Sequence, residues 1–267
     1  MADILCRSVM RSGARKRLRY LSMSSDWKKR VIKSFGVNSG SYAQNNFVQK
    51  RIAEGLARNL PEYVSPRVLE VGCGTGDFTR HLLSAYQGGR FDITDLSEEM
   101  LRDAQASISD ERVTWHVMDG EAPDVEGNYD LIVGNMAFQW FERPHEALRR
   151  LRDLLTDDGI LLYSVPSAKS FPEWQSSLDA LGLPHGLLKP VDWDGGFEEQ
   201  DIVVDYGNTF GFLRSLKQTG AHIPNAEYQA MSVPDLRRAC NLNDRNYGGQ
   251  ATWKILYGKI KYAGASE

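Results

Sequence analysis

The sequence lacks a long apolar run, an excess of charge of one sign, and more than a few cysteines. None of its apolar runs approaches the roughly 20 residues of a membrane span, and its net charge is only −3. We therefore expect neither a membrane nor a nucleic acid as partner. Cys6, Cys73 and Cys240 form no CxxC pair and have no zinc-ligand spacing. This pattern argues against a disulfide framework and against a metal site, and it favours a reducing compartment, so we expect a cytoplasmic location.

The N-terminus differs in composition from the rest of the chain. From Arg7 to Arg30 there are nine basic residues and one acid, Asp26. We interpret residues 1–25 as a basic, disordered extension outside the fold, as a start codon placed too early would produce, with Met23 as the true start. A transit peptide, which is also rich in Arg and Ser, and an arm that captures an acidic partner remain alternatives.

A nucleotide-binding crossover is predicted from residue 67 onward. Arg67–Val71 is a short apolar run typical of a buried strand, and it leads directly into the turn Gly72-Cys73-Gly74-Thr75-Gly76. An amphipathic helix follows, with Phe78, Leu82 and Leu83 on one face. Glycines suit this position because the backbone turns tightly and a ligand lies against it without a Cβ in the way.

Two acidic residues indicate which ligand this turn accepts. The spacing is Gly-x-Gly-x-Gly, which differs from the Gly-x-Gly-x-x-Gly of NAD-binding proteins. Glu70, two residues before the first glycine, would repel a pyrophosphate but pair with a methionine ammonium group. Asp95, 19 residues after Gly76, ends the next strand (Arg90–Thr94) and is placed to accept hydrogen bonds from both ribose hydroxyls. These features favour a nucleoside with a cationic tail.

Three further strands are predicted. They are Val113–Val117, Tyr129–Val133 and Gly159–Val165, and Pro144 opens a helix that carries Leu148, Leu151, Leu154 and Leu155. Asp119, just after the third strand, is placed to accept the adenine amine; a plain turn aspartate is the alternative. Ligands of such sheets lie beyond the carboxyl ends of the strands, where the acids and Asn135 fall.

These segments resemble the class I S-adenosylmethionine-dependent methyltransferases. The resemblance runs through EVGCGTG, DLSEEML, DGEAP and YDLIVGN within residues 67–165. It implies an α/β, Rossmann-like, doubly wound sheet of seven strands, mostly parallel with an antiparallel last strand; Ile202–Asp205 and Thr252–Tyr257 fit the two remaining strands. The implied cofactor is S-adenosyl-L-methionine, and the implied cofactor-binding residues are Gln49, Glu70, Gly72, Cys73, Gly74, Gly76, Asp95, Leu96, Met100, Asp119, Gly120, Glu121, Asn135 and Met136.

Three stretches outside this core resemble a narrower family, the malonyl-acyl-carrier-protein O-methyltransferases of biotin synthesis. They are FGVNSGSYAQNNFVQ (35–49), NMAFQW (135–140) and FLRSLKQTGA (212–221), with ILYG near the end. The sequence departs from the family at Ser41–Gln44, and Glu173–Glu199 matches no known segment. The resemblance implies an acyl-carrier protein as substrate carrier. We expect a monomer or weak dimer.

The domain organisation follows from the same resemblance. Residues 26–64 are expected to form an N-terminal helical lid, and residues 65–267 the methyltransferase domain. Within that domain we expect a helical insertion at about 167–200 and a helix at about 209–220 on the substrate side. Arg143, Arg149, Arg150 and Arg152 could form a basic rim for an acidic carrier protein or simply a solvated helix face.

The expected chemistry needs no general base. A carboxylate is already ionised at neutral pH, and the sequence shows no His-Asp pair that would deprotonate another acceptor. No catalytic residue is therefore predicted, only positioning by Tyr42, Gln139 and Trp140. Arg214 could recognise the malonyl carboxylate with a bidentate fork, and Lys217 lies one turn further along the same helix. For both, a solvated helix face is the alternative.

Three other functions remain open from the sequence. One is a methyltransferase for a small free acid, similar to the trans-aconitate enzyme, which also has a Gln-Trp segment. Another is a mitochondrial assembly factor of the same fold that does not methylate, which would suit the basic N-terminus. The third is a protein that binds the cofactor without chemistry.

Overall fold

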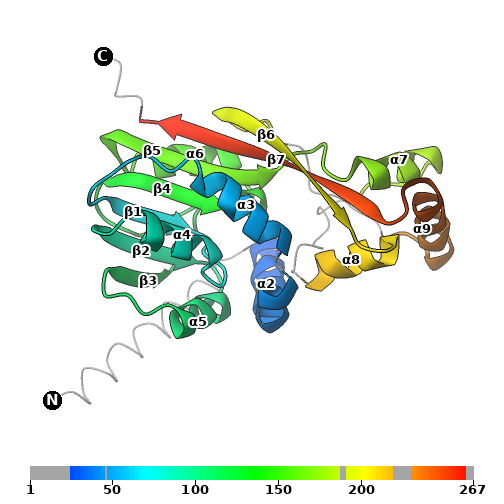
Figure 1. The fold of residues 1–267 in the computed structure, drawn as a ribbon, viewed down its shortest axis with the longest axis horizontal. Coiled ribbons are helices and arrows are strands. Elements are labelled where there is room, and N and C mark those ends of the chain that lie inside the picture. The colour runs from blue at the N-terminus through cyan, green and yellow to red at the C-terminus, as the bar shows by residue number, and fades with distance from the viewer. Residues whose placement is uncertain (1–24, 46, 187–190, 219–229, 263–267) are drawn as a thin grey trace.

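The computed structural model describes residues 25–45, 47–186, 191–218 and 230–262, with side chains omitted for residues 36–45. Its centre is a seven-stranded sheet in the order β3-β2-β1-β4-β5-β7-β6 (Figure 1). β7 runs antiparallel to both its neighbours and the other strands are parallel to one another, as predicted. The strands are β1 (Arg67–Val71), β2 (Arg90–Asp95), β3 (Val113–Val117), β4 (Tyr129–Asn135), β5 (Leu155–Pro166), β6 (Gly196–Asp205) and β7 (Gln250–Lys261).

The strand order changes direction at β1, which lies between β2 and β4. The chain leaves β1 toward β2 and β3, and later returns to the other side of β1 with β4 and β5. In an open α/β sheet this reversal leaves a crevice beyond the carboxyl ends of the two diverging strands. The fold therefore places the ends of β1, β2, β3 and β4 around one crevice.

Helices cover both faces of the sheet and explain the continuous apolar strands. Val68 and Leu69 are both fully buried, yet they belong to different hydrophobic clusters on opposite faces of the sheet. The helices are α2 (Asp26–Asn45), α3 (Phe47–Ala57), α4 (Asp77–Ala85), α5 (Glu98–Ser107), the short helix η1 (Phe138–Trp140), α6 (Pro144–Arg152), α7 (Pro172–Ala180), α8 (Thr209–Gln218) and α9 (Val233–Tyr247). Among the described residues, no helix is long and apolar enough to cross a membrane.

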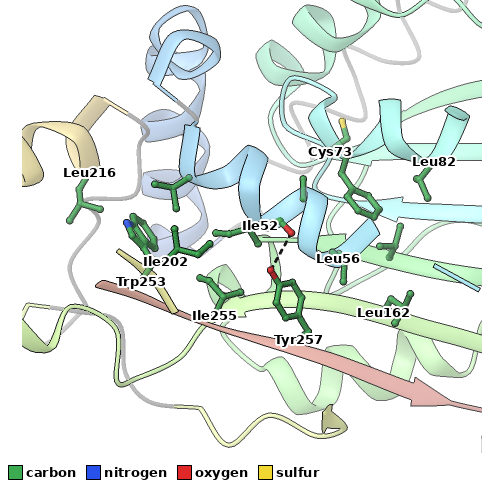
Figure 2. Close-up of a cluster of buried hydrophobic side chains, with 14 of the residues drawn as sticks. Ile52, Leu56, Cys73, Leu82, Leu162, Ile202, Leu216, Trp253, Ile255 and Tyr257 are labelled. Atoms are coloured by element: carbon green, nitrogen blue, oxygen red, sulfur yellow. Dashed lines mark hydrogen bonds between the residues drawn. The ribbon is translucent and has the colours of Figure 1, made fainter. Parts of the chain in front are cut away.

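The N-terminal helix α3 is part of the core. Ile52 and Leu56 are fully buried and pack with Leu162 of β5 and Tyr257 of β7 (Figure 2). The Tyr257 hydroxyl donates to the Ile52 carbonyl oxygen at 3.4 Å. The sequence predicted a helical lid over residues 26–64. The structure has helices α2 and α3 in this range, but α3 packs into the hydrophobic core of the domain.

The C-terminal half departs from the predicted helical insertion at 167–200. Among the described residues of that segment, Pro172–Ala180 alone is α-helical, and Gly196–Gln200 begins β6, which pairs with β7 through the main chain. β6 is an edge strand, and Phe197, Glu198 and Glu199 are exposed, so no alternating burial marks it in the sequence. The observed helix α6 is also shorter than predicted. It ends at Arg152, and Leu155, which was expected on this helix, is the first residue of β5.

Helix α9 was not predicted, although its end signals are readable. Ser232 is its N-cap and accepts from the Asp235 amide at 3.2 Å, and Gly248 ends it in the left-handed conformation with φ of 62°. The predicted helix at 209–220 is observed as α8, and residues 219 and 220 lie outside the described part. α7, α8 and α9 gather beside one end of the β6–β7 pair (Figure 1).

Candidate functional site

The glycine turn after β1 is fastened to the end of β2. The amides of Gly72 and Cys73 both donate to the Thr94 carbonyl oxygen at 2.9 Å, and the Gly74 amide donates to Asp95 Oδ2 at 2.8 Å. Gly72 has φ of +76°, and a Cβ there would lie 2.6 Å from the Cβ of Ala137. The turn therefore depends on glycine for both its backbone conformation and its close approach to the loop after β4.

Glu70 presents a carboxylate oxygen that no described group satisfies. The side chain is 1% exposed; its Oε2 accepts from the Thr79 hydroxyl at 2.6 Å, while Oε1 is buried without a hydrogen-bond partner. Burial raises the pKa of Glu70 from 4.5 to about 8, although the Thr79 hydrogen bond opposes this. A buried acceptor left unpaired costs free energy, so the residue suits a donor that arrives with a ligand.

Asp95 organises the neighbouring backbone. Its Oδ1 accepts from the Ser97 amide at 2.7 Å, and its Oδ2 accepts from Gly74. Burial raises the pKa of Asp95 to about 6, and the backbone hydrogen bonds partly offset this. Ser97 then caps α5, accepting from the Met100 amide at 3.4 Å, which fixes Leu96 and Met100 beside the turn. A carboxylate has more acceptor positions than these two amides occupy.

Asp119 and Glu121 share a lysine from the N-terminal helix. Lys28 Nζ lies 2.5 Å from Asp119 Oδ2 and 2.7 Å from Glu121 Oε2, and all three side chains are nearly buried. Burial lowers the pKa of Lys28, but the hydrogen bonds and charges of the two acids outweigh it, so the net pKa lies above 10.5. Glu121 Oε1 also accepts from the Arg143 amide at 2.7 Å.

The loop after β4 forms the opposite wall. Met136 has a positive φ of 55°, which is unusual for a residue with a side chain, and its amide donates to both the carbonyl and hydroxyl oxygens of Ser164. The Ser164 hydroxyl donates to Asn135 Oδ1 at 2.8 Å. Gln139 Nε2 donates to the Met136 carbonyl at 2.8 Å. These bonds hold a strained segment in a single conformation beside the turn.

Helix α2 packs across the crevice and contacts the loop after β4. The Phe35 ring meets the Trp140 ring edge-on, with centroids 5.2 Å apart, and Trp27 Nε1 donates to the Trp140 carbonyl at 3.0 Å. From α3, Gln49 is 7% exposed, and its Oε1 has no partner among the described residues.

Together these elements line a pocket with about 960 Å³ of empty space, part of it open to solvent. Every predicted cofactor-binding residue lines it except Gly76, which ends the turn at the start of α4. Trp140 lines it too, whereas Gln139 does not. Nine further lining residues were not predicted: Lys28, Val31, Phe35, Val71, Asp77, Phe78, Met118, Ala137 and Phe141.

The predicted substrate-recognition residues lie outside this pocket. Arg214 and Lys217 are exposed on α8, which packs against α2. The backbone of Tyr42 belongs to α2, and its side chain lies outside the described part. The arginines of the predicted basic rim contact groups nearby on the surface: Arg143 and Arg150 pair with Glu146, Arg152 pairs with Asp153, and Arg149 donates to the His145 carbonyl.

Comparison with known proteins defines the class. Residues 69–161 match a methyltransferase domain family. The phosphoethanolamine N-methyltransferase 2 of Haemonchus contortus, solved with phosphomonomethylethanolamine and S-adenosylhomocysteine, superposes with a TM-score of 0.54 over 90% of this chain and 61% of that one, at 15% identity. The chain is an S-adenosylmethionine-dependent methyltransferase with the predicted fold.

Two curated relatives narrow this further. A malonyl-[acyl-carrier protein] O-methyltransferase of Magnetococcus marinus is 35% identical over 246 residues, which is 86% of this chain and 91% of the relative. A biotin biosynthesis bifunctional protein of Bordetella avium is 30% identical over 241 residues, which is 86% of this chain and 51% of that protein. The chain belongs to the malonyl-[acyl-carrier protein] O-methyltransferase family.

Proposed function

We propose that the protein transfers a methyl group from S-adenosylmethionine to the free carboxylate of malonyl-acyl-carrier protein, in an early step of biotin synthesis. The observation that supports this substrate is the 35% identity over 91% of the Magnetococcus relative. That similarity extends well beyond the cofactor domain. It therefore includes segments outside residues 69–161.

The carboxylates around the pocket suit the functional groups of the cofactor. Glu70, with its unpaired Oε1, would pair with the methionine ammonium group. Asp95 would accept the ribose hydroxyls, and Asp119 the adenine amine. Cys73, Leu96 and Met100 offer contact surface among these acids.

The cofactor supplies a methyl group on a sulfonium, which an ionised oxygen can attack in line. The protein's share is to position that oxygen and to exclude water from it. Val31, Phe35 and Trp140 give the α2 side of the pocket an apolar lining that serves both purposes. No side chain has to remove a proton from a carboxylic acid substrate at neutral pH.

We assign recognition of the malonyl carboxylate to Arg214, with support from Lys217, since α8 packs against α2, the helix that contributes Lys28, Val31 and Phe35 to the pocket. Tyr42, Gln139 and Trp140 would position the acyl group. We place the reaction in the cytoplasm, where the buried free cysteines Cys73 and Cys240 stay reduced.

The test is methyl transfer from labelled S-adenosylmethionine, with malonyl-acyl-carrier protein, malonyl-CoA and trans-aconitate offered separately. The proposal expects strong label on the malonyl-carrier protein. Label on trans-aconitate alone would replace the carrier-bound substrate with a small free acid. Absence of label on all three would refute the proposed reaction.

A further inference from the structure

Lys28 connects the N-terminal helix to the adenine end of the pocket. It belongs to the basic N-terminal stretch, but its Nζ contacts Asp119 at 2.5 Å and Glu121 at 2.7 Å, 91 residues or more along the chain. Its side chain is 13% exposed, against 47% for the neighbouring Lys29, which pairs only at 3.3 Å with Asp26 of its own helix. Lys28 therefore forms nearly buried ion pairs with two specific acids, Asp119 and Glu121.

The two acids need such a cation. Asp119 and Glu121 are 10% and 8% exposed and lie close enough to share one ammonium group. Two carboxylates in one poorly hydrated place repel each other, and a cation between them offsets that repulsion. The nearby Arg150 directs its guanidinium to the Glu121 carbonyl and to Glu146 instead.

The hydrogen-bonding chemistry of Asp119 decides which base it can bind. A carboxylate oxygen accepts hydrogen bonds. The exocyclic amine of adenine is a donor and suits such an oxygen, whereas the carbonyl oxygen that replaces the amine in hypoxanthine is itself an acceptor. Asp119 Oδ1 accepts from the Glu121 amide at 3.0 Å, and the residue lines the pocket.

The same lysine fixes the helix that covers the pocket. Val31 and Phe35 follow Lys28 by three and seven residues, and all three line the pocket from α2. At the other wall, Trp27 and Phe35 attach α2 to Trp140. The ion pairs at Lys28 attach α2 to Asp119 and Glu121 in the segment after β3.

We infer that Lys28 is a positioning residue for the cofactor, which holds the Asp119 carboxylate in place as the acceptor of the 6-amino group and thereby selects an aminopurine nucleoside. The inference rests on the proposed adenine position at Asp119. Lys28 thus contributes to cofactor specificity in addition to attaching α2 to the wall of the pocket.

The test compares two nucleosides in binding assays that contain no methyl acceptor. S-Adenosylhomocysteine carries the 6-amino group, and S-inosylhomocysteine has a carbonyl oxygen in its place. Lys28→Met should weaken binding of the adenosyl compound about ten- to a hundredfold, as loss of a charge-assisted contact predicts, with little effect on the inosyl compound. Lys28→Arg should restore most of the affinity, and Lys29→Met, which removes the same charge one residue away, should bind as the wild type does.

Several binding results would overturn the inference about Lys28. Equal weakening for both compounds would mean that Lys28 only supports the structure, and tighter binding of the adenosyl compound by Lys28→Met would mean that the lysine competes with adenine. Either result overturns the inference, as does wild-type affinity. An Asp119→Asn protein with unchanged affinity would overturn the adenine position itself. Because no acceptor is present, failure of malonyl-carrier protein as a substrate would leave these results unaffected.

Discussion

Glu70 should make the stability of the protein without cofactor fall as the pH rises. Its carboxyl is buried, and its pKa lies at about 8 in the folded protein against an ordinary value of 4.5. A group whose pKa is raised on folding holds its proton more tightly in the folded state, so deprotonation favours unfolding. The loss begins near pH 4.5 and is complete above about pH 8. Across this window the two values correspond to roughly 4–5 kcal/mol for this one group.

Glu70→Gln removes the titration while keeping the shape and an acceptor for Thr79. The free energy of unfolding, measured by urea titration without cofactor at pH 5 and pH 8, should favour the variant at pH 8. The advantage over wild type should grow by about 3 kcal/mol between these two pH values. Glu54→Gln, at an exposed position of α3, is the matched control and should show no such growth. A variant whose stability changes with pH in parallel with wild type would refute the proposed burial cost.

The same residue should make cofactor binding depend on pH in the opposite direction. Pairing with the methionine ammonium group requires the ionised carboxylate, which is about one tenth of the population at pH 7 if the pKa is about 8. Affinity for S-adenosylhomocysteine by calorimetry should therefore rise roughly twentyfold from pH 6 to pH 7.5 in wild type. Glu70→Gln should bind weakly with a flat profile, and an unchanged slope in the variant would remove Glu70 from the ammonium site.

Other substitutions test the remaining parts of the site. Asp95→Asn should weaken S-adenosylmethionine binding about ten- to a hundredfold by calorimetry, because a charged acceptor is lost; wild-type affinity would contradict its ribose assignment. Gly72→Ala should cost roughly 1–3 kcal/mol of stability in denaturant titrations, since a side chain at φ of +76° is strained and meets Ala137, and a neutral result would contradict the tight turn. Arg214→Ala should lower kcat/KM for malonyl-carrier protein at least about tenfold with unchanged cofactor affinity. Equal kinetics in Arg214→Ala and wild type would remove Arg214 from substrate recognition.

The central strands could be predicted because they are buried on both faces. Arg67–Val71 is observed with the predicted bounds, since a parallel strand covered by helices reads as a continuous apolar run. Val113–Val117 is also observed with the predicted bounds, although it is an edge strand and none of its residues is buried. The glycine turn and the acids at the strand ends were predictable for a related reason. Sheet topology brings the carboxyl ends of neighbouring strands together without any knowledge of side-chain packing.

The features that the sequence did not predict depend on contacts between residues far apart in the chain. The first half of β6 is stabilised by main-chain pairing at a sheet edge and leaves Phe197 exposed, so its side chains show no pattern. Lys28 was counted with the basic N-terminal residues because its partners are 91 or more positions away. The spacing of Lys28, Val31 and Phe35 along one helix face was the available signal, but a serine- and lysine-rich segment does not show which face is buried.

We propose that the methyl group goes to the free carboxylate of the malonyl group on its carrier. This is tested by the intact mass of malonyl-acyl-carrier protein after incubation with the enzyme and S-adenosylmethionine, beside acetyl-acyl-carrier protein, which lacks that carboxylate. The malonyl form should gain the mass of one methylene, and the acetyl form should be unchanged. Modification of both carriers, or of neither, would contradict the proposal.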